Sequence, residues 1–282
     1  MFHPIVRRSA VCRLVVACAP LLTLACGGQP RDDQSQAGNA TDPAPLVDYL
    51  AQENQYSQHG EELIIRDFFR DRRDGFFLDV GCAWPVRYSN TYYLESRLGW
   101  TGIGIDALPE YAERWLKRRR KSRFFNFIVT DHSGGPQTFY RTRRPDLRGV
   151  SSLHGGRGPV GQIEYEEIQI PTITLTDLLD QNDIAKIDLL TMDIEDAEPK
   201  ALAGFDIDRF SPELVCVEAH VDVRTSLLEY FLHTATRVSS ATPNETRSTT
   251  TSPARRAAEP AVADLDGRRW RALVVAGIRQ RE

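Results

Sequence analysis

Short apolar runs alternate with amphipathic stretches through the middle of the chain. Runs that fit buried strands cover residues 76–80, 101–106, 124–129, 187–193 and 214–218. Helical spacing of apolar residues covers 60–72 and 90–98, Pro109 is placed to open a further helix, and another is expected over 199–203. Strands that alternate with helices predict an α/β fold with a parallel sheet covered by helices on both faces.

The two ends of the chain have a different pattern. Basic residues precede a short apolar run, and the run ends at Cys26-Gly-Gly, which resembles a bacterial lipoprotein cleavage box with Cys26 as the lipidated residue. An uncleaved apolar N-terminus or a misassigned start would explain the same pattern. We therefore predict four segments: a lipoprotein-like signal peptide (1–26), a disordered tether (27–45), one folded domain (46–232) and a low-complexity, disordered tail (233–282).

Composition narrows the function classes. A chain of 282 residues has room for one sizeable domain with appendages. Its formal net charge of −4 argues against a general nucleic-acid binder, because such domains are usually basic. The five cysteines have neither metal-ligand spacing nor a disulfide pattern. We expect no nucleic-acid partner, and membrane association only through the N-terminal lipid.

Two predicted strand ends carry candidate cofactor residues. Gly81 follows the first strand, and Asp106 closes the second. Ligands of open parallel sheets bind at the carboxyl ends of strands, and an acid there can accept hydrogen bonds from ribose hydroxyls. The loop has one glycine where a dinucleotide site has three, so a pyrophosphate would lack room. This favours S-adenosylmethionine, which has no phosphate, over NAD or FAD.

Several motifs together resemble the FkbM-type methyltransferase family over residues 55–220. They are, in order, Tyr56-Ser-Gln-His-Gly-Glu-Glu62, Phe77-Leu-Asp-Val-Gly81, Tyr88-Ser-Asn-Thr-Tyr92, Leu98-Gly-Trp-Thr-Gly-Ile-Gly-Ile-Asp106 and Leu190-Thr-Met-Asp-Ile-Glu-Asp-Ala-Glu198. The resemblance implies a Rossmann-like class I methyltransferase sheet, here one that could lack its last strands because the tail offers so little pattern. It also implies S-adenosylmethionine as cofactor and methylation of a hydroxyl on a small-molecule or sugar-like acceptor. Carried over by position, the cofactor residues would be Asp79, Gly81, Ser89, Asn90, Asp106 and Asp131.

Methyl transfer needs positioning and a group that accepts the hydroxyl proton. The acidic cluster after the fourth strand, above all Asp193 and Glu195, would face the substrate and the methionine moiety in the resembled family. This chain has Asp196 where the family prefers glycine. His132 and His220 follow strands and are further candidates for the base, together with Asp193. Nothing in the spacing indicates a metal site.

Two basic segments leave the charge of the acceptor open. Residues 117–121 and 141–148 are rich in arginine, which fits solvated surface or, alternatively, binding of an anionic acceptor. The leader adds a conflict, because S-adenosylmethionine is kept in the cytoplasm whereas the leader suggests the cell envelope. Three functions therefore stay open: an active methyltransferase, a catalytically degenerate methyltransferase-like lipoprotein that binds a ligand, and an NAD-dependent enzyme.

Overall fold

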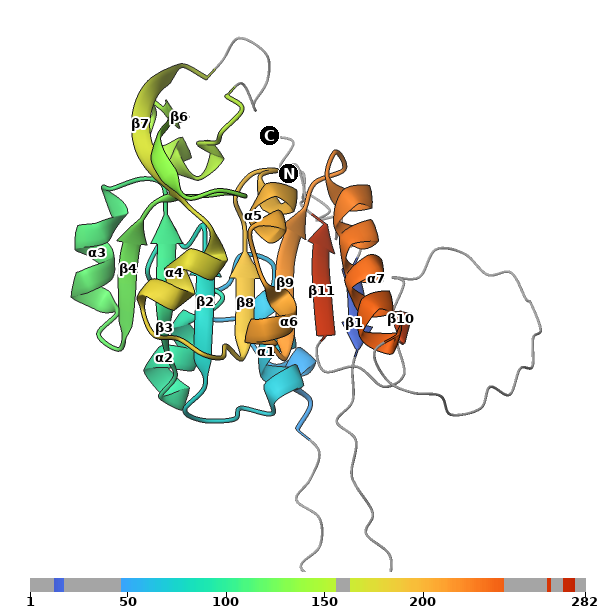
Figure 1. Ribbon diagram of the computed structural model, residues 1–282. Helices are drawn as coiled ribbons and strands as arrows, with labels where there is room; N and C mark the ends of the chain where they lie inside the picture. Colours follow the sequence, from blue (N-terminus) through green and yellow to red (C-terminus); the bar gives the residue numbers. More distant parts are fainter. Residues whose placement is uncertain (1–12, 18–46, 156–162, 241–262, 265–270, 277–282) are drawn as a thin grey trace, which may run out of the picture.

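A mixed sheet forms the centre of the computed structural model, which describes residues 13–17, 47–155, 163–240, 263–264 and 271–276 (Figure 1). Its strand order is β10-β1-β11-β9-β8-β2-β3-β4. The central part is parallel throughout and comprises β2 (Phe76–Val80), β3 (Thr101–Asp106), β4 (Ser122–Asn126), β8 (Leu189–Met192) and β9 (Leu214–Ala219). The predicted Rossmann-like α/β sheet is confirmed.

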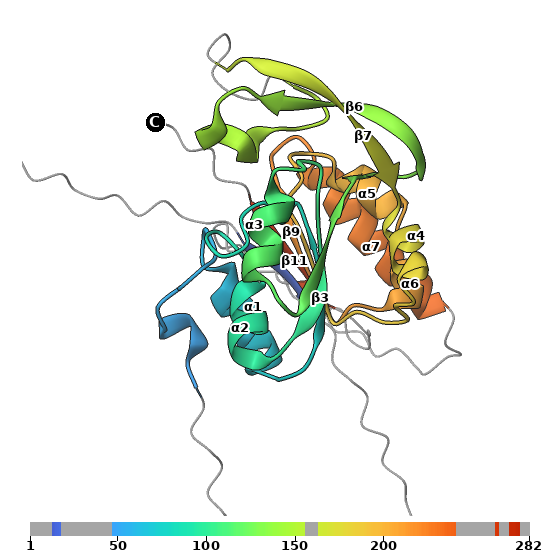
Figure 2. The ribbon, with the colours of Figure 1, turned by 90° about the vertical axis from the view of Figure 1, so that its left-hand side faces the viewer.

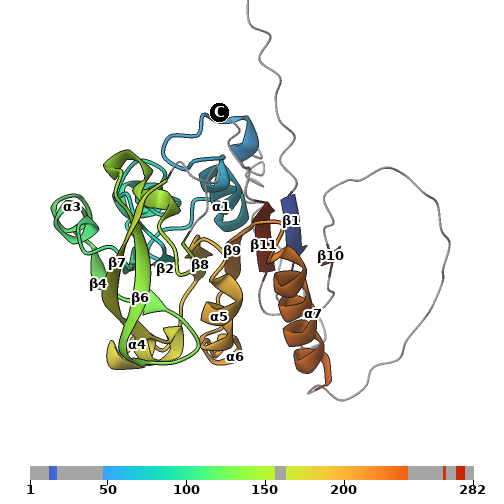
Figure 3. The same ribbon diagram turned by 90° about the horizontal axis from the view of Figure 1, so that it is seen from above.

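Helices cover both faces of this sheet (Figures 2 and 3). On one side lie α1 (Glu61–Phe69), α2 (Tyr92–Leu98) and α3 (Tyr111–Arg118). On the other lie α4 (Leu175–Gln181), α5 (Glu198–Ala203), α6 (Ile207–Phe210) and α7 (Arg224–Ser240). A short 3-10 helix, η1 (Tyr49–Ala51), precedes α1. The helix expected to open at Pro109 begins two residues later, at Tyr111.

Side-chain alternation along the strands builds one apolar layer on each face. In β2, Phe77 packs with the layer of α1 and α2, whereas Leu78 packs with the layer of α4 to α7. Gly104 of β3 leaves space for Trp115, since a Cβ there would lie 2.5 Å from the indole ring. The fully buried Trp115 thereby fixes α3 against the sheet.

The third predicted strand, 124–129, divides between two sheets. β4 ends at Asn126, and β5 (Ile128–Val129) pairs with β7 (Tyr165–Ile173) in a second sheet of order β5-β7-β6. Together β6 (Gly134–Thr142), the 3-10 helix η2 (Pro145–Val150) and β7 form an arm, which extends over the carboxyl edge of the main sheet (Figure 2). The sequence analysis did not predict this arm.

The outer strands come from the two ends of the chain. β11 (Arg271–Ala276) pairs with β9 in parallel, β1 (Arg13–Ala17) pairs with β11 antiparallel, and β10 (Ala263–Asp264) pairs with β1. The sheet thus continues beyond β9, where the sequence predicted that further strands could be missing.

Two predicted segments overlap with these elements. β1 falls inside the predicted leader, and α7 runs past Leu232 into the predicted tail. Cys26 and the tether 27–45 lie outside the described residues. Among the helices that the structure describes, none combines the length and apolar character needed to cross a membrane.

Candidate functional site

The predicted convergence of Gly81 and Asp106 is present. Val80 and Ile105 are register partners in β2 and β3, so the residues that follow them are neighbours at the carboxyl edge. The Gly81 amide donates a hydrogen bond of 2.8 Å to the Ile105 carbonyl. The two positions on which a nucleoside site would depend therefore lie side by side.

Gly81 is required by packing between two loops of the protein. Its φ is +78°, and a Cβ would lie 1.8 Å from the carbonyl oxygen of Asp193. In the sequence, Gly81 was identified as a candidate cofactor residue, and in the structure the protein's own packing already requires a glycine there. The next helix, α2, starts only at Tyr92.

Asp106 holds the loops after β2 and β3 together. Its Oδ2 accepts from the Ala83 amide at 2.9 Å, and its Oδ1 accepts from the Leu108 amide at 2.8 Å. Burial raises the pKa of this carboxyl to about 7, against the effect of the two hydrogen bonds. Since each carboxylate oxygen can accept more than one hydrogen bond, Asp106 retains capacity for hydroxyl donors of a ligand.

Asp79 is buried beneath the loop that leads into α2. Its Oδ2 accepts a hydrogen bond of 2.5 Å from the Thr91 hydroxyl. Burial raises the pKa of Asp79 to about 6, and the nearby Arg119 opposes the increase. Because Oδ2 is hydrogen-bonded to Thr91, Asp79 holds this loop in place, and its effect on a bound cofactor would be partly indirect.

Residues 117–121 were interpreted as solvated surface or, alternatively, as binding an anionic acceptor. Arg119 differs from the first interpretation because it is buried. Its side chain is fully buried and pairs with Glu95 at 2.7 Å. It also donates to the Pro85 carbonyl, at 3.2 Å, and to the Thr91 hydroxyl, at 2.8 Å. Its guanidinium therefore braces the loop after β2, whereas the adjacent Arg118 and Arg120 are exposed as expected.

Ser89 and Asn90 have different surroundings. The Ser89 hydroxyl is buried, accepts from the Tyr92 amide at 3.1 Å and from Arg119 at 3.2 Å, and so stabilises the start of α2. Asn90 donates from Nδ2 to the Thr191 hydroxyl at 3.0 Å and lines a pocket. Of the pair, only Asn90 is placed where it could contact a ligand in that pocket.

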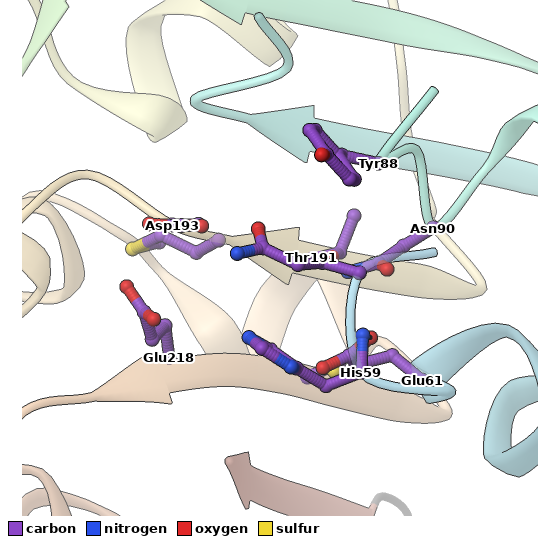
Figure 4. A pocket seen from close by; sticks show the side chains of 10 residues that line it. His59, Glu61, Tyr88, Asn90, Thr191, Asp193 and Glu218 are labelled. Carbon is purple, nitrogen blue, oxygen red and sulfur yellow. Dashed lines mark hydrogen bonds between the residues drawn. The ribbon is translucent and has the colours of Figure 1, made fainter. Parts of the chain in front are cut away.

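The pocket opens at the carboxyl ends of β8 and β9 (Figure 4). Asp193 and Glu218 lie together at one end of it, and Asn90 lies at the other. Three of its lining residues are acidic and none is lysine or arginine; the lining consists of Gln58, His59, Glu61, Tyr88, Asn90, Thr191, Met192, Asp193, Cys216 and Glu218. Gln58 and His59, which precede α1, are among these lining residues, although the sequence indicated them only as part of a motif.

Three carboxylates form a cluster at this pocket. Asp193, Glu195 and Glu218 each place an oxygen within 4.8 Å of the other two, a spacing at which acids can share a proton or hold a cation. Burial raises the pKa of Glu218 well above its usual range, and a hydrogen bond to Asp193 adds to the increase. Glu218 was not predicted as a site residue. It lies near the end of a predicted strand, however, and the same kind of position identified Asp106.

The backbone conformation explains how this chain can have Asp196 where the resembled family prefers glycine. Glu195 and Asp196 have φ values of +54° and +72°, the left-handed region that glycine adopts most easily and aspartate tolerates better than most residues. Asp196 Oδ1 lies 3.1 Å from Nδ1 of His220, whose Nε2 is 3.8 Å from Glu218. The loop thus places His220 beside the acidic cluster.

Asp131 and His132 lie where the arm begins, and both are exposed. His132 Nδ1 is 2.8 Å from Asp131 Oδ1, and this contact lowers the pKa of Asp131. Neither residue lines the pocket. Of the two candidate histidines, the structure brings His220 to the acidic cluster and leaves His132 apart from the pocket lining.

Two arginines of the arm, Arg141 and Arg148, are paired with carboxylates. Arg141 contacts Glu166 at 2.8 Å and Glu110 at 3.5 Å, and Arg148 contacts Glu110 at 3.1 Å. These ion pairs connect the arm to the start of α3. The basic segment 141–148 therefore has a structural use, independent of any anionic ligand.

The fold and this edge define a Rossmann-like α/β protein with a glycine turn and an acid on adjacent strand ends. Residues 74–237 match the model of the Methyltransferase FkbM domain. The chain belongs to this methyltransferase family. Comparison with curated proteins found no match, and comparison with solved structures found none either.

Proposed function

We propose that the protein transfers the methyl group of S-adenosylmethionine to a hydroxyl group of a small molecule. Family membership supports methyl transfer as the reaction. The observation that carries the choice of cofactor is the placement of Gly81 beside Asp106, at the edge where parallel sheets bind nucleosides. Asp106 would accept hydrogen bonds from the ribose hydroxyls.

The charges at the pocket fit this cofactor. S-adenosylmethionine carries a positive sulfonium and a positive ammonium beside one carboxylate and is a net cation, whereas NAD carries a negative pyrophosphate. Besides the protonated Glu218, the lining contains Glu61 and Asp193 and neither lysine nor arginine, so it favours the first and disfavours the second. When bound, S-adenosylmethionine supplies an electrophilic methyl carbon on a sulfonium that is already a good leaving group.

Asp193 is the group we assign to accept the proton. Its carboxylate lies at the pocket, and Glu218, whose raised pKa keeps it protonated at neutral pH, hydrogen-bonds to it. Asp193 would take the hydroxyl proton when the acceptor oxygen is methylated, with bound S-adenosylmethionine supplying the methyl group and leaving as the neutral thioether. Glu195 and His220 border this pair and would orient it.

The acceptor we propose is polar and sugar-like, without a negative charge. Tyr88 and Asn90 can hydrogen-bond hydroxyl groups, and the acidic lining disfavours phosphate or carboxylate substituents. Two of the arginines that were considered for an anionic acceptor, Arg141 and Arg148, are engaged by Glu110 and Glu166. The sugar-like character itself rests on the family resemblance.

Calorimetric titration of the purified chain with S-adenosylmethionine tests the proposal. We expect saturable binding to the wild type and at least about tenfold weaker binding to Asp106→Ala, since a buried acceptor of two ribose hydroxyls is removed. Asp146→Ala is the matched control, because Asp146 is exposed and pairs only with Arg144 among the described contacts. Equal affinity of Asp106→Ala and wild type would show that the site is elsewhere.

A further inference from the structure

A buried tyrosine hydroxyl near Asp106 has no hydrogen-bond partner in the described part of the chain. Tyr111, the first residue of α3, is only 2% exposed, and its hydroxyl oxygen is enclosed. Nη1 of Arg148, on the arm, is also buried without a hydrogen bond, but it has an ion pair with Glu166 at 4.0 Å. Burial of polar groups without partners is rare in proteins, so each such group needs an explanation.

The position of Tyr111 is fixed by its packing. Its ring meets Trp84 edge-on, with 5.5 Å between centroids, and Trp84 belongs to the loop after β2. Trp115, one helical turn later on the same face, packs beneath Gly104 of β3. Tyr111 therefore lies one turn closer to the carboxyl edge, where Asp106 ends β3.

Charged neighbours place the hydroxyl itself at this edge. Burial raises the pKa of Tyr111, and the Asp106 and Glu110 carboxylates raise it further, while Arg148 opposes them. The hydroxyl is thus close to the carboxylate that we assign to the ribose. A phenylalanine would pack in the same apolar cluster without the cost of an unpaired hydroxyl.

We propose that Tyr111 is a further cofactor-binding residue, whose hydroxyl hydrogen-bonds to the adenosine part of S-adenosylmethionine beside Asp106. This rests on the proposed function. The hydroxyl is unpaired in the protein alone because its partner is the ligand.

Titration of wild type and Tyr111→Phe with S-adenosylmethionine and with 5′-methylthioadenosine, which lacks the amino-acid part, tests the assignment. Tyr111→Phe should bind both ligands about five- to tenfold more weakly, the loss of one hydrogen bond in a buried site. Without ligand, its melting temperature should equal or exceed that of the wild type. Tyr93→Phe is the matched control, because Tyr93 lies on α2 and stacks on Arg66.

The outcomes separate this inference from the proposed function. If the wild type binds neither ligand, both are wrong. If the wild type binds and Tyr111→Phe binds equally well, only the role of Tyr111 is wrong. Weaker binding of S-adenosylmethionine alone would place the contact outside the adenosine, and a melting temperature lowered by several degrees would reveal a partner within the protein. Each of these last two results also overturns the assignment.

Discussion

At Gly81 the loops after β2 and β8 approach so closely that the position excludes any side chain. The carbonyl of Asp193 occupies the space of a Cβ, and the φ of +78° is unfavourable for an L-residue. Gly134, at the start of β6, has ordinary φ and no neighbouring atom within 4 Å of a Cβ. The same substitution at Gly81 and at Gly134 therefore compares a crowded position with an open one.

Gly81→Ala should lower the free energy of unfolding by at least about 2 kcal/mol, through strain and displacement of the loop after β8. It should also weaken cofactor binding, because that loop carries Asp193. Gly134→Ala should change stability by less than about 0.5 kcal/mol. Urea denaturation of both variants measures the difference, and equal effects would argue against the close contact of the two loops.

An unusual dependence of stability on pH is expected from the buried Asp79 and the partly buried Asp106. Their pKa values in the folded protein are about 6 and about 7, whereas an unfolded aspartate has a pKa of about 4. At pH values between the unfolded and the folded pKa of each group, the folded protein binds more protons than the unfolded chain. The stability that these groups contribute is therefore present at low pH and lost as pH rises from about 4 to about 7.

Urea denaturation at intervals from pH 4.5 to 7.5 should show this decrease, on the order of 1 kcal/mol per pH unit for each group over its own window. Asp79→Asn should flatten the lower part of the profile, since it removes one titrating group. Stability that rises through this window in the wild type, or an unchanged slope in the variant, would contradict the burial of these carboxyls.

At the scale of elements, the strands that carry the site were predictable and the parts that brace it were not. The apolar runs identified β2, β3, β8 and β9, and the rule for strand ends identified Asp106. Arg119 could not be distinguished from its exposed neighbours, because nothing in a run of basic residues indicates which one turns inward. The arm was missed because β6 starts Gly-Gly-Pro and exposes much of its surface, so it lacks a clear strand pattern.

Replacing Arg119 tests whether its contacts hold α3, α2 and the loop after β2 together. Arg119→Ala leaves Glu95 buried without its partner and should lower stability by about 3–5 kcal/mol. Arg120→Ala, one residue away and exposed, should have almost no effect. Thermal melting compares the two, and similar melting temperatures would mean that the buried pair does not hold these elements together.

At the scale of the whole molecule, charge is segregated. Three acids line the pocket, while Arg119 and, on the arm, Arg141 and Arg148 are paired with carboxylates that do not line it. Sequence alone showed a net charge of −4 and could not show this arrangement, since it depends on pairings between distant residues such as Glu110 and Arg148. The acidic side chains of the pocket are one reason why we propose a cationic cofactor rather than a dinucleotide.

The most direct test of this account is a parallel titration of the wild-type chain with S-adenosylmethionine and with NAD under identical conditions. Saturable binding of S-adenosylmethionine, with NAD at least about a hundredfold weaker, is the predicted result. Tighter binding of NAD would contradict the account, and binding of neither would leave the fold without the cofactor that we assign to it.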